Sequence, residues 1–131
     1  MTVEAEIYDR LSGHAGLSAL VINRIYPNHV PQNVTLPAVS YHRVSAVRPS
    51  AMGADSGVVR ARFQVDVWAS SFADASGARP VAEQVRLALQ RWSTTSGTIV
   101  QETFFLNERD LYEDRRDLHH AALDFEINYE E

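Results

Sequence analysis

One short segment, residues 59–67, constrains the fold more than any other part of the sequence. Apolar side chains alternate there with polar ones: Val59, Ala61, Phe63, Val65 and Val67 are interleaved with Arg60, Arg62, Gln64 and Asp66. A period of two places the two sets on opposite faces of a β-strand. One buried face and one wet face are typical of an antiparallel sheet that is covered on one side only. The segment therefore predicts such a sheet.

An apolar stripe at helical spacing predicts the element that covers this sheet. Its members are Val81, Val85 and Leu89. Glu83 and Arg86 form an i, i+3 pair on the opposite, exposed side. Gly77 and Pro80 interrupt the front of the segment. Either the helix begins near Arg79 with Pro80 in its first turn, which we favour, or a longer helix kinks there. We expect the stripe to pack on the apolar face of strand 59–67.

The N-terminal region is predicted to be helical. Val3, Ile7 and Leu11 recur at helical spacing, and Gly13 follows in the position of a C-cap glycine. The apolar run 17–21 predicts a further helical turn.

Four more segments read as strands or strand-like pieces. Residues 23–27 form a brief extended piece, and 37–47, 98–106 and 117–129 have the composition or alternation of strands. We expect residues 107–117, which are highly charged, to form a hairpin connection between the last two strands. Strands in pairs around one central helix indicate an α+β fold, with a mainly antiparallel sheet and helices packed on one face.

Residues 48–57 are predicted to be a long hairpin loop. The segment contains Pro49, Gly53 and Gly57, and its single large apolar side chain is Met52. Such a segment offers no packed element of its own, and hairpin loops are usually much shorter. The loop is either a mobile connection or a contact segment that becomes ordered on a partner, with Met52 and Arg48 as its contact residues.

The composition describes one ordinary globular domain, residues 1–131, and excludes several classes of protein. There is no cysteine, which excludes disulfide-stapled, zinc-finger and thiol-nucleophile designs. Seventeen acidic residues against twelve basic ones, a net charge of −5, argue against a general nucleic-acid binder. All twelve basic residues are Arg, a bias that either a GC-rich genome or selection for Arg at interfaces would produce. We find no membrane span and no secretion signal, and expect a soluble chain made in the cytosol.

A search for catalytic or metal-binding patterns finds little. His119 and His120 are adjacent on a predicted strand, so they point to opposite faces and cannot hold one metal together. His42 and Asp66 could meet across a hairpin as a dyad, although such pairs are usually surface contacts. The acidic residues between 110 and 117 alternate with arginines and do not follow the calcium-loop template. We therefore expect no enzymatic activity, no cofactor and no metal, and favour an interaction protein.

Five segments, taken together, resemble a known family. Arg24–Pro27, Pro37–Tyr41, Arg60–Ala69, Glu108–Glu113 and Ala122–Phe125 look like successive parts of the tail completion proteins of long-tailed phages, in the right order and spacing. They span nearly the whole chain. The family is similar in fold to tail terminator proteins.

The resemblance implies a structural role in the virion tail or neck. It implies a homo-oligomeric, hexameric ring that stops polymerisation of the tail tube protein and docks the tail on the head connector or adaptor protein. Assembly would take place in the host cytoplasm, DNA would only pass through the lumen, no membrane would be involved, and no catalytic residues are carried over. The parent particle could be a phage, a prophage or a gene transfer agent.

Charged residues on the wet face and in the two loops, together with Met52, are our candidate interface residues. They offer both signs of charge on a face that no helix is expected to cover. The set is Arg48, Met52, Arg60, Arg62, Asp66, Arg109, Asp110, Arg115 and Arg116.

Two other functions stay open from the sequence. One is a head–tail connector or adaptor protein of the neck, which would also be a ring subunit. The other is a small cytosolic enzyme or ligand-binding α+β domain, which a cleft with converging titratable groups would favour.

Overall fold

A five-stranded sheet forms the centre of the computed structural model, which describes residues 2–75, 77–114 and 118–131. The strand order is β1-β2-β5-β7-β6. The strands are β1 (Ile25–Pro27), β2 (Ala38–Val47), β5 (Val58–Ala69), β6 (Val100–Glu113) and β7 (Leu118–Glu130). β1 pairs parallel with β2, and the other pairs are antiparallel. The predicted α+β class with a mainly antiparallel sheet is confirmed.

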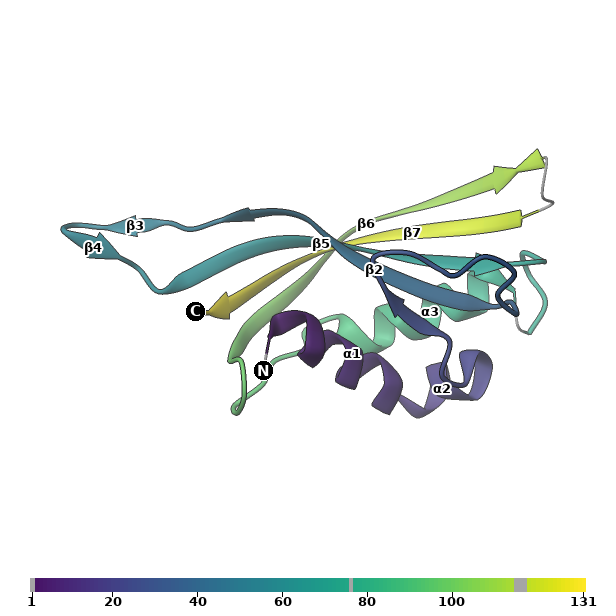
Figure 1. Cartoon of the computed structure of the whole chain (residues 1–131), viewed down its shortest axis with the longest axis horizontal. Coiled ribbons are helices and arrows are strands. Elements are labelled where there is room, and N and C mark those ends of the chain that lie inside the picture. The colour runs from purple at the N-terminus through teal and green to yellow at the C-terminus, as the bar shows by residue number, and fades with distance from the viewer. Residues whose placement is uncertain (1, 76, 115–117) are drawn as a thin grey trace.

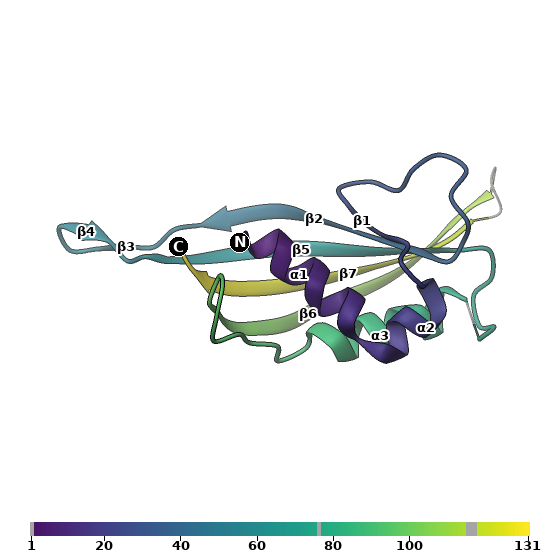
Figure 2. The same cartoon turned by 60° about the horizontal axis from the view of Figure 1, so that its bottom comes forward.

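Three helices lie on one face of this sheet and leave the other face uncovered (Figures 1 and 2). They are α1 (Val3–Gly13), α2 (Ala15–Val21) and α3 (Ala78–Leu89). Arg10 of α1 donates from Nε to the carbonyl oxygen of Ala88 in α3 at 2.6 Å, which ties the two longer helices together.

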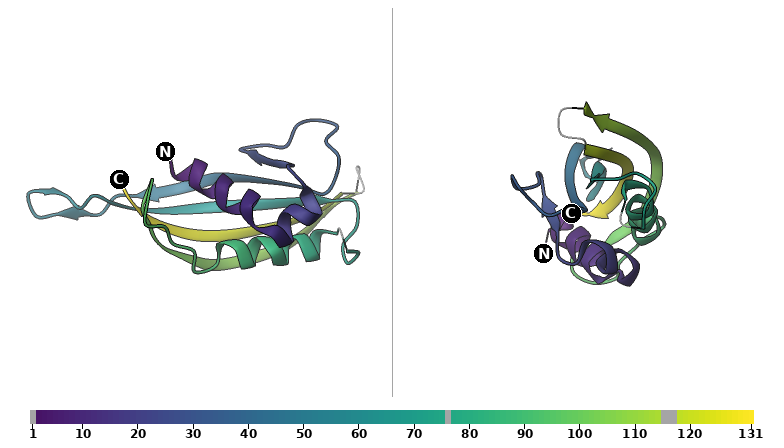
Figure 3. Two further views of the ribbon diagram at one scale, coloured as in Figure 1. Left: turned by 90° about the horizontal axis from the view of Figure 1, so that it is seen from below. Right: turned by 90° about the vertical axis from the view of Figure 1, so that its right-hand side faces the viewer.

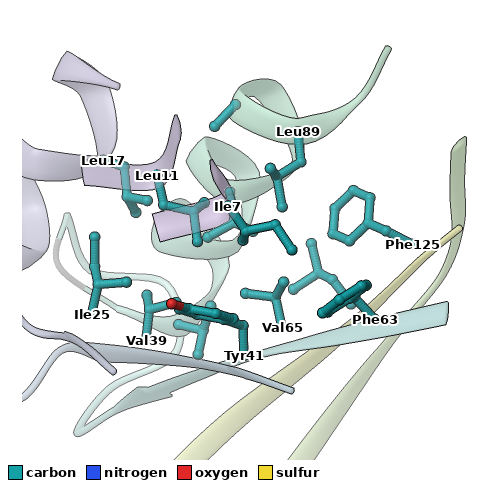
Figure 4. Close-up of a cluster of buried hydrophobic side chains, with 14 of the residues drawn as sticks. Ile7, Leu11, Leu17, Ile25, Val39, Tyr41, Phe63, Val65, Leu89 and Phe125 are labelled. Carbon is teal, nitrogen blue, oxygen red and sulfur yellow. The ribbon is translucent and has the colours of Figure 1, made fainter. Parts of the chain in front are cut away.

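The core lies between the helices and the sheet, where the apolar face of β5 and the apolar stripe of α3 are both buried (Figure 4). The apolar set of strand 59–67 is at most 1% exposed: Val59, Ala61, Phe63, Val65 and Val67. Val81, Val85 and Leu89 of α3 are fully buried in the same cluster, together with Ile7 and Leu11 of α1. The predicted burial of both faces is therefore confirmed.

The helix ends follow local sequence signals, with one difference from expectation. Thr2 caps α1 by accepting a hydrogen bond from the amide of Ala5. Gly13 is the last helical residue rather than the cap; His14 is the C-cap, in an extended conformation, and also the N-cap of α2. No left-handed residue is needed because the chain continues directly into the next helix. In α3 the N-cap is Gly77 and Pro80 lies in the first turn, as we favoured.

Residues 48–57 join the antiparallel strands β2 and β5, as the prediction of a long hairpin loop required, and they contain two short strands that the sequence analysis did not anticipate. β3 (Ser50–Ala51) and β4 (Ala54–Asp55) pair antiparallel, with a turn at Met52 and Gly53 between them. Gly53 has φ +79°, a value that favours glycine. We call residues 48–57 the arm, because they extend β2 and β5 beyond the body of the molecule (Figures 1 and 3).

The prediction that residues 107–117 form a hairpin connection was wrong for most of that segment. β6 continues to Glu113, and its pairing with β7 runs from Asn107 opposite Asp124 to Glu113 opposite Leu118. Strand pairing uses backbone groups, so a long partner strand can hold a charged segment in the sheet. Residues 115–117 lie outside the described part of the chain.

Candidate functional site

The uncovered face of the sheet carries the polar positions of β5 and β7. Arg60, Arg62, Gln64 and Asp66 alternate with the buried residues of β5 and therefore point away from the helices. The pairing register places Arg62 beside Glu126 and Gln64 beside Asp124. Two carboxylates on this face, those of Asp66 and Asp124, are nevertheless almost completely buried.

Asp124 is the centre of the first group. Its side chain is 3% exposed, and its Oδ2 lies 3.2 Å from Nη2 of Arg62 and 3.7 Å from Nη2 of Arg109. A buried carboxylate needs such partners, because it has lost most of its hydration. β5 and β6, on either side of β7, each supply one guanidinium, so the carboxylate links three strands.

Asp66 is the centre of the second group. Its Oδ1 lies 2.7 Å from Nε2 of His120 and accepts a hydrogen bond from Nε2 of Gln64 at 2.7 Å. His42 Nδ1 lies 3.6 Å from the other oxygen, so the pair that the sequence suggested does meet across the β2–β5 hairpin. Gln64 Oε1 accepts from Nη2 of Arg109 at 3.2 Å. The two carboxylate groups thus belong to one polar network, which we call the sheet-face network.

Among the described residues, the sheet-face network lacks one part of a catalytic triad. A triad needs a nucleophile hydrogen-bonded to the histidine. The nearby hydroxyl of Ser40 accepts instead from Nε1 of Trp68 at 3.3 Å. The Trp68 ring stacks on His120 with a centroid distance of 3.9 Å. His119, as expected, points to the other face, where its ring lies near Phe72 and Tyr112.

A pocket of about 870 Å³ opens beside this network. The loop 28–36 forms one wall, and the rest is lined by Ser40, His42, Asp66, Trp68 and Leu118. Among residues 2–75, 77–114 and 118–131, no three His, Cys, Asp or Glu side chains gather in a way that could hold a metal ion.

The arm is anchored at its base by a charged pair. Arg48 donates from Nε and Nη2 to the two carboxylate oxygens of Glu131, each at 2.9 Å. This hydrogen bonding raises the pKa of Arg48 and lowers the pKa of Glu131. Met52, at the tip of the arm, is fully exposed.

The structure separates the predicted interface residues into several places. Arg62, Asp66 and Arg109 belong to the sheet-face network, where Asp66 is almost inaccessible. Asp110 points to the helix side of the sheet, where it lies 3.5 Å from Nη1 of Arg79. Arg60 is exposed on the uncovered face, and Arg48 and Met52 belong to the arm. Arg115 and Arg116 lie outside the described residues.

Sequence reasoning missed the exposed apolar side chains at the two edges of the sheet. On β6 these are Phe104, Leu106, Leu111 and Tyr112, each about half exposed. On β2, Val44 and Val47 are also at least half exposed. The segment 107–113 has no apolar alternation, so no periodic signal marked Leu111 or Tyr112 as strand residues.

Within the part of the chain that the structure describes, no helix has the length and apolar character to span a bilayer. A comparison with curated proteins returns no match. The fold is similar to a chain in the solved structure of the virion of a native gene transfer agent particle: the TM-score is 0.79 and the sequence identity 21%, over 95% of this chain and 92% of that one. The sequence family described as tail completion protein gp17 matches residues 5–130. The chain therefore belongs to the tail completion protein gp17 family, and is a structural protein of the phage tail.

Proposed function

We propose that this chain is the subunit of a hexameric ring that ends the tail tube and joins the tail to the head connector. The role of the family in completing tails supports this proposal. The proposed partners are further copies of the chain, the tail tube protein and a connector or adaptor protein of the head.

The distribution of exposed apolar side chains is the observation that carries the proposal. Those on strands occur on β6, at one edge of the sheet, and on β2 and the arm, toward the other edge. The remaining ones, Tyr8, Ile22, Phe72 and Leu87, lie outside the strands. In a closed ring each contact is heterologous, so one patch of a subunit meets a different patch of its neighbour. Two unlike apolar surfaces on opposite sides of one subunit meet that requirement.

The arm suits a contact with a neighbouring component. Its paired strands and the contact between Arg48 and Glu131 give it a defined direction before any partner is present. Met52 at its tip would be covered only by another molecule. We propose that the arm contacts the neighbouring subunit, the tail tube or the connector.

Tail length in particles that lack this protein tests the proposal. If the ring ends the tube, its loss should yield tubes of irregular and excessive length, measured by electron microscopy of negatively stained lysates. Uniform tails of normal length that fail to join heads would instead assign the chain to the adaptor role. Complementation with the unaltered gene is the control.

The oligomeric state is tested separately on purified protein and on isolated tails. We expect six copies at one end of the tail, visible as a ring in end-on class averages. A different copy number at the tail end would contradict the hexamer.

A further inference from the structure

We propose that neighbouring copies join through the two free edges of the sheet. β6 of one copy would pair antiparallel with residues 42–47 of β2 in the next, and the uncovered face would line the lumen. This inference rests on the proposed ring and specifies how it is held together.

The first edge is β6, the last strand in the sheet order. It has 14 residues and pairs with β7 on one side. A long edge strand that carries apolar side chains is a template for pairing with another chain. Phe104 and Leu106 are 47% and 48% exposed there.

The second edge is the C-terminal half of β2. β1 pairs only with residues 39–41 of β2, so the register leaves residues 42–47 beyond its reach. Val44 and Val47 are exposed in this half. Each edge therefore combines strand backbone with apolar side chains, and Figure 3 shows β2 and β6 on opposite sides of the sheet when it is viewed along the long axis.

The strand directions allow the sheet to continue from copy to copy. β2, β5, β7 and β6 alternate in direction, and because they are four, β2 and β6 run in opposite directions. Rotation about an axis roughly parallel to the strands preserves the direction of each one. The neighbour's β2 would therefore run antiparallel to β6, which continues the alternation.

The two edges also match in height along the strands. Ser45 pairs with Arg62, Arg62 with Glu126, and Glu126 with Phe104. Ser45 and Phe104 thus lie at the same level and both on the uncovered face. Neighbours in a ring are related by rotation about the ring axis, with no shift along it. If the strands run nearly parallel to that axis, β6 of one copy therefore meets β2 of the next at the same level.

Bulges restrict the pairing to a short stretch. The β2–β5 register shifts at Val44, and the β6–β7 register shifts at Gln101 and at Leu106. Bulges near an edge oppose unlimited strand addition. This favours a specific contact between the two edges over open-ended aggregation.

The inference places the helices outside and the uncovered face toward the axis. Arg60, Arg62 and Glu126 would then face the lumen, with both signs of charge. A lumen of mixed charge lets DNA pass without the strong retention that a basic surface gives.

Engineered cysteines test the edge contact, because the chain has no cysteine of its own. The double variant Ser45→Cys/Phe104→Cys, assembled into tails and mildly oxidised, should give disulfide-linked ladders up to the full ring on non-reducing gels. The double variant Val47→Cys/Phe104→Cys tests a pairing in which β2 of the neighbour is shifted by two residues along β6. Each single variant should stay monomeric on the same gel.

The outcomes separate this inference from the proposed ring. Rings that form with either cysteine pair but give no ladder would overturn the edge contact and leave the ring intact. Disulfide dimers from Phe104→Cys alone would mean that two β6 edges meet, which also overturns it. Tails without any ring would overturn both proposals.

A second pair of variants gives a readout that does not depend on disulfide geometry. Phe104→Asp should lower ring incorporation at least tenfold, measured by the amount of protein in purified tails. Leu87→Asp is the matched control, since Leu87 on α3 is 48% exposed and would lie on the outside. Equal incorporation of the two variants would contradict the proposed edge.

Discussion

Buried carboxylates on an otherwise solvent-facing sheet surface are the least ordinary residues of this protein. Asp124→Asn keeps the shape of the side chain and removes the charge that Arg62 and Arg109 approach. We expect the free energy of unfolding to fall by about 1–3 kcal/mol, since hydrogen bonds to charged groups contribute about that much. Urea melts at neutral pH measure the loss. Glu126→Gln on the same strand should change stability much less, and an equal loss would show that general charge on this face is what matters.

Substitution of the single residue Phe63 tests the core. The Phe63 side chain is 1% exposed and lies between β5 and the helices (Figure 4). Phe63→Ala should cost about 3–5 kcal/mol, because it removes apolar contacts and leaves a cavity. Arg60→Ala, three residues away on the opposite face, should stay within about 0.5 kcal/mol of the unaltered protein. A loss below about 1 kcal/mol for the Phe63 variant, measured by denaturant unfolding, would refute the burial of this face.

Tyr41 gives the protein a specific response to alkaline pH. Burial, and then the charge of Glu4, raise the pKa of its hydroxyl to about 12. In the unfolded chain the group loses its proton near pH 10, so the folded state holds more protons between those values. The contribution of Tyr41 to the free energy of unfolding is therefore fully present below pH 10 and declines as the pH rises toward 12.

The Tyr41→Phe variant isolates this effect. The difference in unfolding free energy between the variant and the unaltered protein should shift in favour of the variant from pH 9 to pH 11.5. Urea melts across that range measure it. A difference that does not change with pH would show that Tyr41 titrates as it does in the unfolded chain.

At the scale of elements, the arm is the part whose removal the body should tolerate best. Replacing residues 48–57 by Asp-Gly closes the β2–β5 hairpin with a short turn and leaves the buried side chains of both strands in place. We expect a nearly unchanged melting temperature but impaired joining of heads to tails, counted by electron microscopy. If the shortened protein joins heads and tails normally, the arm is only a connection.

The anchor of the arm can be tested without shortening it. Glu131→Gln weakens the contact with Arg48 but keeps all of the arm's own residues. Amide exchange in residues 48–57 should become faster while exchange in the core stays the same. Assembled tails should restore protection if the arm binds a neighbouring component, and free exchange in assembled tails would exclude such a contact.

At the scale of the whole molecule, charge on the uncovered face should matter for assembly rather than for folding. Arg60→Glu reverses an exposed charge on that face. We expect weaker tail termination, seen as a broader distribution of tail lengths, with an unchanged melting temperature. Arg62→Glu is a poorer probe, because it would place a second carboxylate beside buried Asp124 and lower stability. Unaltered tail lengths in the Arg60 variant would show that this charge takes no part in tail termination.

The sequence by itself determined the core and the fold class. Strand 59–67 and helix 78–89 each have one strong periodicity, and each apolar face must be buried against another element. Those two requirements leave little freedom, so the burial of Phe63, Val65 and Val85 in one core could be predicted before any tertiary contact was known.

The ends of the sheet were decided only by the tertiary structure. Residues 107–113 carry no apolar alternation, and neither do the short strands β3 and β4, which form a small sheet of their own. All three are strands because a neighbouring strand offers its backbone groups for pairing. The sheet-face network depends in the same way on register: a shift of one residue would turn Asp66 and Asp124 into the core and away from their partners. Sequence reasoning could pair His42 with Asp66 across a hairpin, but only the sheet order brings His120 and Arg109 to the same face. Local periodicity is a property of one segment, whereas strand pairing and shared faces are properties of several segments at once.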